Sequence, residues 1–211
     1  MRCQPGVWIS IEGVEGVGKT THISTLQSFI EKKLKAPVLI TREPGGTWYA
    51  EKIRELLLLK SDEEVLHPDT ELLLMFASRA QHYHAKILPA LASGCYVICS
   101  RFTDSSLAYQ GGGRGIALAR IQALADWTLK GAEPDLTFLL DMPVEQGLAR
   151  AKARAELDRI EQENIDFFER VRQVYLQLAS HHPKRFEIID ASQSLGGVKE
   201  QIERACERRL R

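Results

Sequence analysis

Short apolar runs recur along the chain, each followed by a longer segment of mixed polarity. The runs that we expect to form strands are Val7–Ile11, Val38–Thr41, Tyr96–Ser100, Leu136–Leu140 and Phe186–Ile189. Their nearly continuous apolar character is typical of strands that are covered on both faces. The segments between them carry apolar residues at helical spacing. They predict helices over roughly 20–34, 48–60, 69–92, 116–129, 144–156, 161–181 and 196–210, with ends uncertain by about 2–4 residues.

The alternation of strands with helices predicts the fold class. Parallel strands joined by helices form right-handed crossovers, which bury the sheet between two helical layers. We therefore expect an α/β protein with a five-stranded parallel sheet flanked by helices. The sequence contains no internal repeat and no linker, so we expect residues 1–211 to form a single domain.

Composition and charge narrow the possible partners. The chain has 211 residues, of which 44% are hydrophobic, and its 28 Lys and Arg residues balance its 28 Asp and Glu residues. This balance argues against a protein that binds nucleic acid or a membrane surface by neutralising phosphates, so an anionic ligand must be met by local charge. The first residues run into a strand without an apolar leader, and we expect a cytoplasmic location with no membrane partner.

A glycine-rich motif follows the first predicted strand and precedes the first predicted helix. Its spacing, Gly13-x-x-x-x-Gly18-Lys19-Thr20, is that of a P-loop. Glycines at this place let successive backbone N–H groups turn inward around a phosphate at a helix N-terminus. In such a loop the lysine reaches the β- and γ-phosphates and the Thr20 hydroxyl ligates Mg²⁺.

The second strand ends in a loop that is suited to a further phosphate. Arg42 is followed by Glu43, Pro44 and two glycines. Pro44 stiffens the turn and the glycines permit close approach to a ligand, so Arg42 could bind a phosphate with two parallel hydrogen bonds. A surface arginine on a tight loop is the alternative.

The third predicted helix and the end of the third strand supply candidates for binding a planar ligand. Phe76 and Arg79 are three residues apart and share a helix face, which suits stacking and hydrogen bonding to a base, although core packing explains Phe76 as well. After the third strand come Arg101 and then Ser106, Tyr109 and Gln110 at helical spacing. These groups could form a polar wall beside the phosphate site. The three glycines that follow Gln110 either end a short helix or approach a ligand.

A basic segment begins at Arg150 and turns acidic at Glu161. A solvated helix with i,i+4 ion pairs is the ordinary interpretation of such a run. Phosphoryl transfer offers another use, because the developing charge must be met by cations on a segment that closes over the site. We therefore predict a mobile lid at about 148–163.

With these features assembled, nearly the whole chain resembles thymidylate kinases. The motifs that carry the resemblance are Ile11–Thr21 (IEGVEGVGKTT), Thr41–Thr47 (TREPGGT), Phe76–His82 (FASRAQH), Ala108–Gly115 (AYQGGGRG) and Glu156–Glu161 (ELDRIE). It is similar to the bacterial form, in which the variable P-loop position is acidic and the catalytic arginine lies in the lid.

The resemblance implies a P-loop nucleoside monophosphate kinase fold and transfer of the γ-phosphoryl group of ATP to dTMP, with Mg²⁺, in a homodimer. The implied catalytic residues are Lys19, Glu15, Arg42, Arg101 and Arg154, with Arg159 a weaker match to a lid arginine. The implied ATP-binding residues are Gly13, Val14, Glu15, Gly16, Val17, Gly18, Lys19, Thr20 and Thr21, with the turn Asp190–Gln193 beside adenine. The implied dTMP-binding residues are Glu15, Arg42, Pro44, Phe76, Arg79, Arg101, Ser106, Tyr109 and Gln110. Of these, Phe76 would stack on thymine and Tyr109 would crowd a ribose 2′-hydroxyl.

The chain departs from the family pattern at Ser100, where the family has an aspartate before the arginine. That carboxylate would help to hold the hydrated Mg²⁺, and serine brings no charge. We therefore expect an active enzyme of reduced rate, with Thr20 as the metal ligand and Ser100 as a weakened supporting position.

Three alternative functions can be compared with the sequence. A GTP-driven switch needs an Asn-Lys-x-Asp element, and the only asparagine, Asn164, is followed by Ile165. The only reason to consider a nucleotide-binding module without catalytic activity is Ser100. Another acceptor such as dUMP stays open, because pocket residues and not the fold set that choice.

Overall fold

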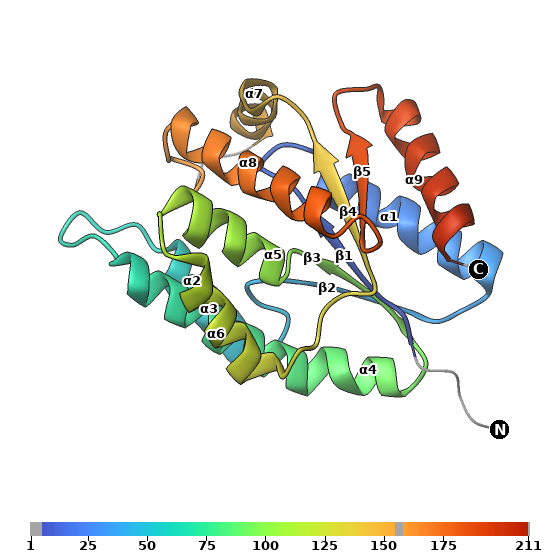
Figure 1. Ribbon diagram of the computed structural model, residues 1–211, viewed down its shortest axis with the longest axis horizontal. Coiled ribbons are helices and arrows are strands. Elements are labelled where there is room, and N and C mark those ends of the chain that lie inside the picture. The colour runs from blue at the N-terminus through green and yellow to red at the C-terminus, as the bar shows by residue number, and fades with distance from the viewer. Residues whose placement is uncertain (1–5, 155–157, 211) are drawn as a thin grey trace.

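The computed structural model describes residues 6–154 and 158–210, and the side chain of Arg154 also lies outside its description. Its strands are β1 (Trp8–Glu12), β2 (Val38–Arg42), β3 (Tyr96–Ser100), β4 (Leu136–Asp141) and β5 (Phe186–Asp190). They form one parallel sheet in the order β2-β3-β1-β4-β5 (Figure 1). The predicted α/β class with a five-stranded parallel sheet is confirmed, and each predicted strand is correct to within one residue at either end.

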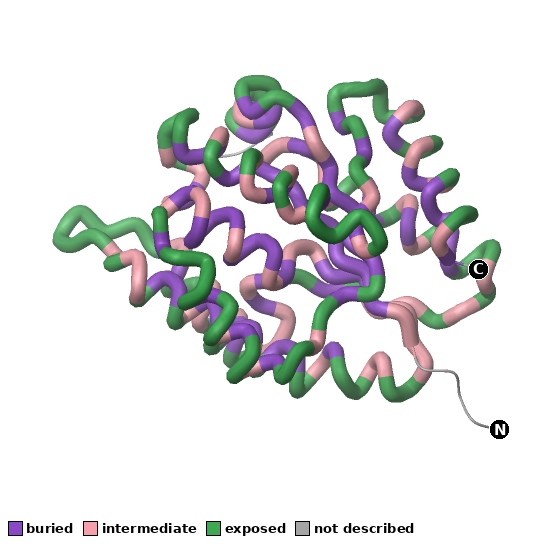
Figure 2. Tube along the Cα trace, in the orientation of Figure 1, coloured by how far each residue is buried: buried purple, intermediate pink, exposed green. Residues whose placement is uncertain are grey.

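The central strand β1 sets the register of the sheet. Ile9 lies opposite Ile98 of β3 on one side and opposite Leu136 of β4 on the other. All five residues of β1 are buried, and the centre of the sheet carries the buried colour in Figure 2. Strands that are covered on both faces have no exposed face that would need polar residues, which is why they read as apolar runs in the sequence.

Helical segments connect these strands and cover both faces of the sheet. They are α1 (Lys19–Phe29), η1 (Ile30–Leu34), α2 (Trp48–Leu58), α3 (Pro68–His82), η2 (Tyr83–Ile87), α4 (Leu88–Ala92), α5 (Thr103–Ser106), η3 (Leu107–Gly113), α6 (Leu118–Leu129), α7 (Val144–Arg154), α8 (Ile165–His181) and α9 (Leu195–Arg209), where η marks π-helical turns. Helix α1 packs behind the sheet and α8 in front of it (Figure 1). This arrangement leaves the carboxyl ends of the strands open, which is where ligands gather in such sheets.

The structure differs from the predicted elements mainly between β3 and α6. The list of predicted helices has none over residues 103–113, but α5 and η3 fill that interval. Consecutive glycines disfavour a helix by intrinsic propensity, and here tertiary packing outweighs that preference. A Cβ on Gly113 would lie 2.4 Å from the Phe167 ring, and one on Gly112 would lie 2.7 Å from Val174. The glycines therefore let η3 lie directly against α8.

The N-terminus of α1 has no side-chain cap, unlike those of several other helices. The side chains of Thr47, Asn164 and Ser194 cap α2, α8 and α9 by accepting hydrogen bonds from backbone N–H groups. In contrast, the N-cap residue of α1 is Gly18, which has a positive φ of 90° and no side chain that could cap the helix. The N–H groups of the first turn of α1 are therefore available to an anion.

Candidate active site

The loop between β1 and α1 has the conformation that its glycines allow. Gly13, Gly16 and Gly18 all have positive φ, between 72° and 132°. The ammonium group of Lys19 folds back over the loop and donates to the carbonyl oxygens of Gly13 at 2.9 Å and Val14 at 2.7 Å. These contacts hold the lysine at the mouth of the loop, where a phosphate would also meet the N–H groups of α1.

The same loop is in direct backbone contact with the start of α7. A Cβ on Gly16 would lie 1.8 Å from the carbonyl oxygen of Gly147, and a Cβ on Gly147 would lie 2.6 Å from that of Glu15. Only a residue without a side chain fits on either side of this contact. The position of α7 and the shape of the P-loop are thus fixed together.

One pocket extends from the P-loop toward the end of β5. It is lined by Gly16–His22, Arg150, Ala191, Gln193, Ser194, Leu195 and Val198. Arg150 of α7 crosses this pocket and donates to the carbonyl oxygen of Ala191 at 3.2 Å. The turn that we predicted to lie beside adenine, residues 190–193, therefore contributes to the same pocket as the P-loop. In the sequence Arg150 is only the first residue of a basic run, and the structure adds it to this site.

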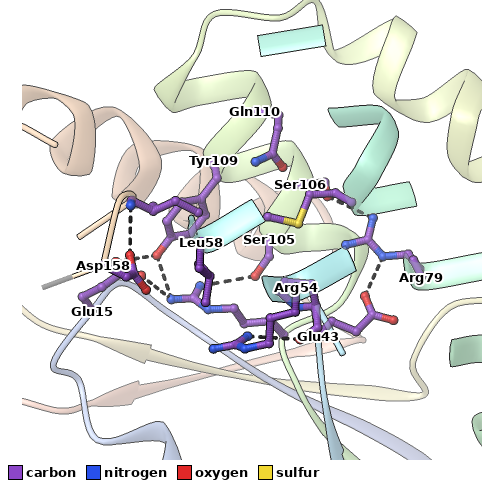
Figure 3. Close-up of a pocket in the computed structure, with 14 residues that line it drawn as sticks. Glu15, Glu43, Arg54, Leu58, Arg79, Ser105, Ser106, Tyr109, Gln110 and Asp158 are labelled. Carbon is purple, nitrogen blue, oxygen red and sulfur yellow. Dashed lines mark hydrogen bonds and ion pairs between the residues drawn. The ribbon is translucent and has the colours of Figure 1, made fainter. Parts of the chain in front are cut away.

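A second pocket opens on the other side of Glu15, beyond the ends of β1 and β3 (Figure 3). Its floor is an ion pair between Arg101 and Glu15 at 2.7 Å, with side chains only 16% and 10% exposed. The Tyr109 hydroxyl donates to Glu15 at 2.6 Å and accepts from Arg101 at 2.8 Å. Arg101 has φ of 67°, a value rarely adopted by residues other than glycine, which is typical of residues held in place at functional sites.

Glu12 lies beneath this floor and is fully buried at the end of β1. It accepts hydrogen bonds from the backbone N–H of Phe102 at 2.7 Å and from the Ser105 hydroxyl at 2.6 Å. Burial, and next the charge of Asp104, raise the pKa of Glu12 to about 7. This carboxyl group therefore belongs to the hydrogen-bonded support of Arg101.

The wall opposite Glu15 is built around Arg79 of α3, which is 2% exposed. Its guanidinium group donates to Glu43 at 2.7 Å, to the Ser106 hydroxyl at 2.9 Å and to the carbonyl oxygen of Phe102 at 3.2 Å. Glu43 in turn lies 3.0 Å from Nδ1 of His82. Arginine has five N–H donors, so this arrangement fixes the guanidinium plane and still leaves donors for a ligand in the pocket.

The structure brings most of the predicted acceptor-site residues together. Glu15, Pro44, Arg79, Arg101, Ser106, Tyr109 and Gln110 all line this pocket. Arg42 does not. Its side chain is 53% exposed and pairs with Glu51 at 2.8 Å, which matches the surface-arginine alternative. Its role as a phosphate clamp remains a prediction.

Arg54 of α2 is a lining residue that our reading of the sequence missed. Its guanidinium group donates to the carbonyl oxygen of Pro44 at 3.0 Å. Burial, followed by the positive charge of Arg42, lowers the pKa of Arg54. A cation whose charged form is disfavoured in this way would gain from a bound anion. No local motif marks Arg54, because it reaches the pocket only through the packing of α2 against α3.

Met75, and not Phe76, lines the pocket beside Arg79. Phe76 is 2% exposed and belongs to a core cluster with Trp8, Leu72 and Tyr83. The Arg79 guanidinium lies over its ring, 4.7 Å from the centroid. The structure therefore favours core packing for Phe76, and base stacking by Phe76 is untested. Met75 precedes Arg79 by four residues and Phe76 precedes it by three, and both spacings place a residue on the same helix face as Arg79. From the sequence we considered only the spacing of three.

The predicted lid is described only in part. The side chain of Arg154 and residues 155–157 lie outside the described residues, so a catalytic role for Arg154 remains a prediction. Asp158 and Ile160, beyond that gap, line the second pocket, beside Glu15, which we call the acceptor pocket after the predicted phosphate acceptor. Arg159 points to α3 instead, where it donates to Glu71 at 2.7 Å.

The donor set near the P-loop fits Mg²⁺. Within residues 6–154 and 158–210, no group of three or more His, Cys, Asp and Glu side chains could hold a metal ion. Mg²⁺ beside phosphates does not need such a cage, since it keeps several waters and takes one or two protein oxygens. The exposed Thr20, on the first turn of α1 and in the P-loop pocket, can offer its hydroxyl.

The two adjoining pockets on a parallel sheet, one built by a P-loop and one by guanidinium groups, define a P-loop nucleoside monophosphate kinase. Comparison with known proteins narrows this class. Residues 11–202 match the family model for thymidylate kinase. The chain is 52% identical to the thymidylate kinase of Pseudomonas putida (strain GB-1) over 94% of this chain and 93% of that protein. It is 51% identical to the thymidylate kinase of Alcanivorax borkumensis over 96% of both chains. The chain belongs to the thymidylate kinase family.

No helix in the described part of the chain has the length and apolar character needed to cross a membrane.

The contact between Gly16 and Gly147 gives the first testable prediction. Gly147→Ala would ordinarily stabilise α7 by about 1 kcal/mol through helix propensity. Here the added Cβ would meet the carbonyl oxygen of Glu15 at 2.6 Å, so we expect a lower Tm and a raised KM for ATP. Gly196→Ala in α9 is the matched control, because its Cβ would have 4.0 Å of clearance, and we expect an unchanged or higher Tm. Thermal unfolding measures both, and equal behaviour of the two variants would contradict the contact.

Proposed function

We propose that this chain phosphorylates dTMP. A phosphate oxygen of dTMP attacks the γ-phosphorus of ATP, the bond from that phosphorus to the β–γ bridging oxygen breaks, and ADP leaves with that oxygen. Such a transfer depends on positioning and on charge stabilisation, since it asks for little covalent work from the protein.

One observation carries the proposal. Glu15 lines the acceptor pocket and its neighbour Gly16 lines the P-loop pocket. Two phosphorylated ligands bound in these pockets would therefore meet end to end across a single peptide unit. Lys19 and the N–H groups of α1 would hold the donor phosphates, and Arg101 would hold the acceptor phosphate, with Arg54 or Arg42 as its second guanidinium.

The base and sugar of dTMP would occupy the far wall of the acceptor pocket. Arg79 and Gln110 would hydrogen-bond the edge of thymine, and Ser106 would support Arg79. Tyr109, held by Arg101 and Glu15, would lie against the sugar, where a ribose 2′-hydroxyl would find little room.

Mg²⁺ would be held by Thr20 with waters and phosphate oxygens, and it would supply positive charge to the β- and γ-phosphates during transfer. Ser100 would replace a carboxylate that supports this ion. We also propose that the enzyme acts in the cytoplasm and forms a homodimer, as the family resemblance implies.

The acceptor can be tested directly. With ATP and Mg²⁺, we expect ADP release to depend on added monophosphate and kcat/KM to be highest for dTMP among dTMP, dUMP, dCMP and dGMP. A coupled ADP-release assay measures all four. Lack of release with every monophosphate would support a nucleotide-binding module without catalytic activity, and a higher kcat/KM for dUMP would assign a different acceptor.

The phosphate clamp can be assigned with a pair of variants. We expect Arg54→Ala to raise the KM for dTMP by roughly 10–100-fold, since a charge-assisted hydrogen bond contributes about 1.5–3 kcal/mol. Arg42→Ala is the comparison, and its half-exposed guanidinium predicts a smaller rise. Steady-state kinetics at saturating ATP would rank them, and a larger effect for Arg42 would restore the assignment made from the sequence.

The effect of Ser100 on the rate can be tested with a single substitution. Ser100→Asp restores a carboxylate near the metal, and we expect kcat to rise by at least roughly threefold, or about 0.6 kcal/mol in the barrier. Ser100→Asn, which adds bulk without charge, is the control and should not raise kcat. If the aspartate variant turns over no faster than the parent, position 100 does not limit the rate.

A further inference from the structure

Glu71 is a buried carboxylate that neither the P-loop nor the phosphate site uses. It lies on α3, one turn before Met75 and two turns before Arg79, so the three residues share one helix face. Its side chain is only 2% exposed. Met75 and Arg79 line the acceptor pocket. Glu71 lies behind that wall, and its partners reveal its role.

Three donor side chains converge on Glu71, two from η3 and its C-cap and one from the loop before α8. Gln110 donates through Nε2 to Oε1 at 2.9 Å. Arg114 donates to both oxygens, and Arg159 donates to Oε2 at 2.7 Å. Burial alone would raise the pKa of Glu71, but the hydrogen bond from Gln110 and the charge and hydrogen bonds of Arg114 lower it. The group is therefore an ionised acceptor at neutral pH and has no proton to donate.

This fixes the orientation of the Gln110 amide. An amide can in general turn its NH₂ or its carbonyl toward a neighbour. A carboxylate accepts only, so Nε2 must face Glu71, and Oε1 must point the other way. Gln110 lines the acceptor pocket with Ser106 and Arg79. In Figure 3 its oxygen lies on the Ser106 side of the amide and its nitrogen on the opposite side. The group offered to a ligand at this point of the wall is an acceptor.

We infer that Glu71 is a positioning residue for base selection, which holds Gln110 so that its oxygen accepts from the ring N3–H of thymine and uracil. Cytosine has an unprotonated N3 and would set two acceptors against each other. A site built to pair with an N–H group strongly disfavours an analogue that lacks it. The inference rests on the proposed function, because it requires the base to bind beside Gln110.

The test compares kcat/KM for dTMP, dUMP and dCMP in the full-length protein and its variants. Glu71→Gln keeps the shape but can donate as well as accept, so the Gln110 amide becomes free to turn. We expect the dTMP/dCMP ratio to fall by roughly tenfold or more. The dTMP/dUMP ratio should stay within about twofold, because both bases carry the N3–H group.

Glu163→Gln is the matched control. Glu163 binds the same Arg114 guanidinium but has no hydrogen bond to Gln110 in the described structure, and it is 28% exposed. Both ratios should stay within about twofold in this variant. A fall in the dTMP/dCMP ratio equal to that of Glu71→Gln would overturn the inference. So would an equal loss for all three pyrimidines in Glu71→Gln, since that is what a purely structural role predicts.

A second variant covers the case in which Glu71→Gln does not fold. Gln110→Leu removes the acceptor itself and should lower the dTMP/dCMP ratio by at least as much. An unchanged ratio would overturn the inference whatever Glu71 does. If turnover is slow, dissociation constants of the three monophosphates from calorimetry give the same ratios. A parent protein that releases ADP with none of them and binds none of them would instead contradict the proposed function.

Discussion

Charged side chains buried beyond the ends of β1 and β3 have to neutralise one another before any ligand arrives. Arg101 faces Glu15, and Arg79 faces Glu43, at 2.7 Å in each case. Leaving one member of such a pair alone in the interior costs several kcal/mol, so removal of either partner strongly destabilises the fold. The consequence is that both guanidinium groups are held in a fixed orientation before a ligand binds. Binding then needs little reorganisation, which is the condition under which fixed charges stabilise a transition state best.

The P-loop differs from the acceptor pocket because it offers main-chain N–H groups to phosphate. The N-cap residue of α1 is Gly18, which provides no side-chain cap. Lys19 donates hydrogen bonds to the carbonyl oxygens of Gly13 and Val14. Backbone N–H groups recognise phosphate oxygens whatever nucleoside they carry, whereas side chains can tell one base from another. The two pockets accordingly differ in construction. This difference also explains how a chain with no net charge can bind two anions, because the charge it needs is local.

The parts that could be predicted from the sequence are those set by local pattern. The strands were located to within a residue because they are short apolar runs, of which β1, β3 and β4 are largely buried. The P-loop was located because its glycines, Lys19 and Thr20 lie close together in the sequence. The parts that escaped depend on packing between distant segments. Residues 107–113 form a π-helix because α8 accommodates its glycines, and Arg54 reaches the pocket because α2 packs on α3. Phe76 and Met75 are adjacent, and only the exact rotation of α3 decides which of them faces the pocket.

The wall of the acceptor pocket that contains Arg79 and Gln110 presents both a hydrogen-bond donor and an acceptor. Arg79 and Gln110 are both held by buried carboxylates: Arg79 by Glu43, which itself lines the pocket, and Gln110 by Glu71, which lies behind the wall. A carboxylate can only accept, so each of these contacts uses N–H donors of Arg79 or Gln110. Arginine has donors to spare and still presents N–H groups to the pocket, whereas the amide has one end of each kind and presents its oxygen. Two identical anchors therefore produce a donor and an acceptor side by side, which is the pattern that complements a carbonyl next to a ring N–H.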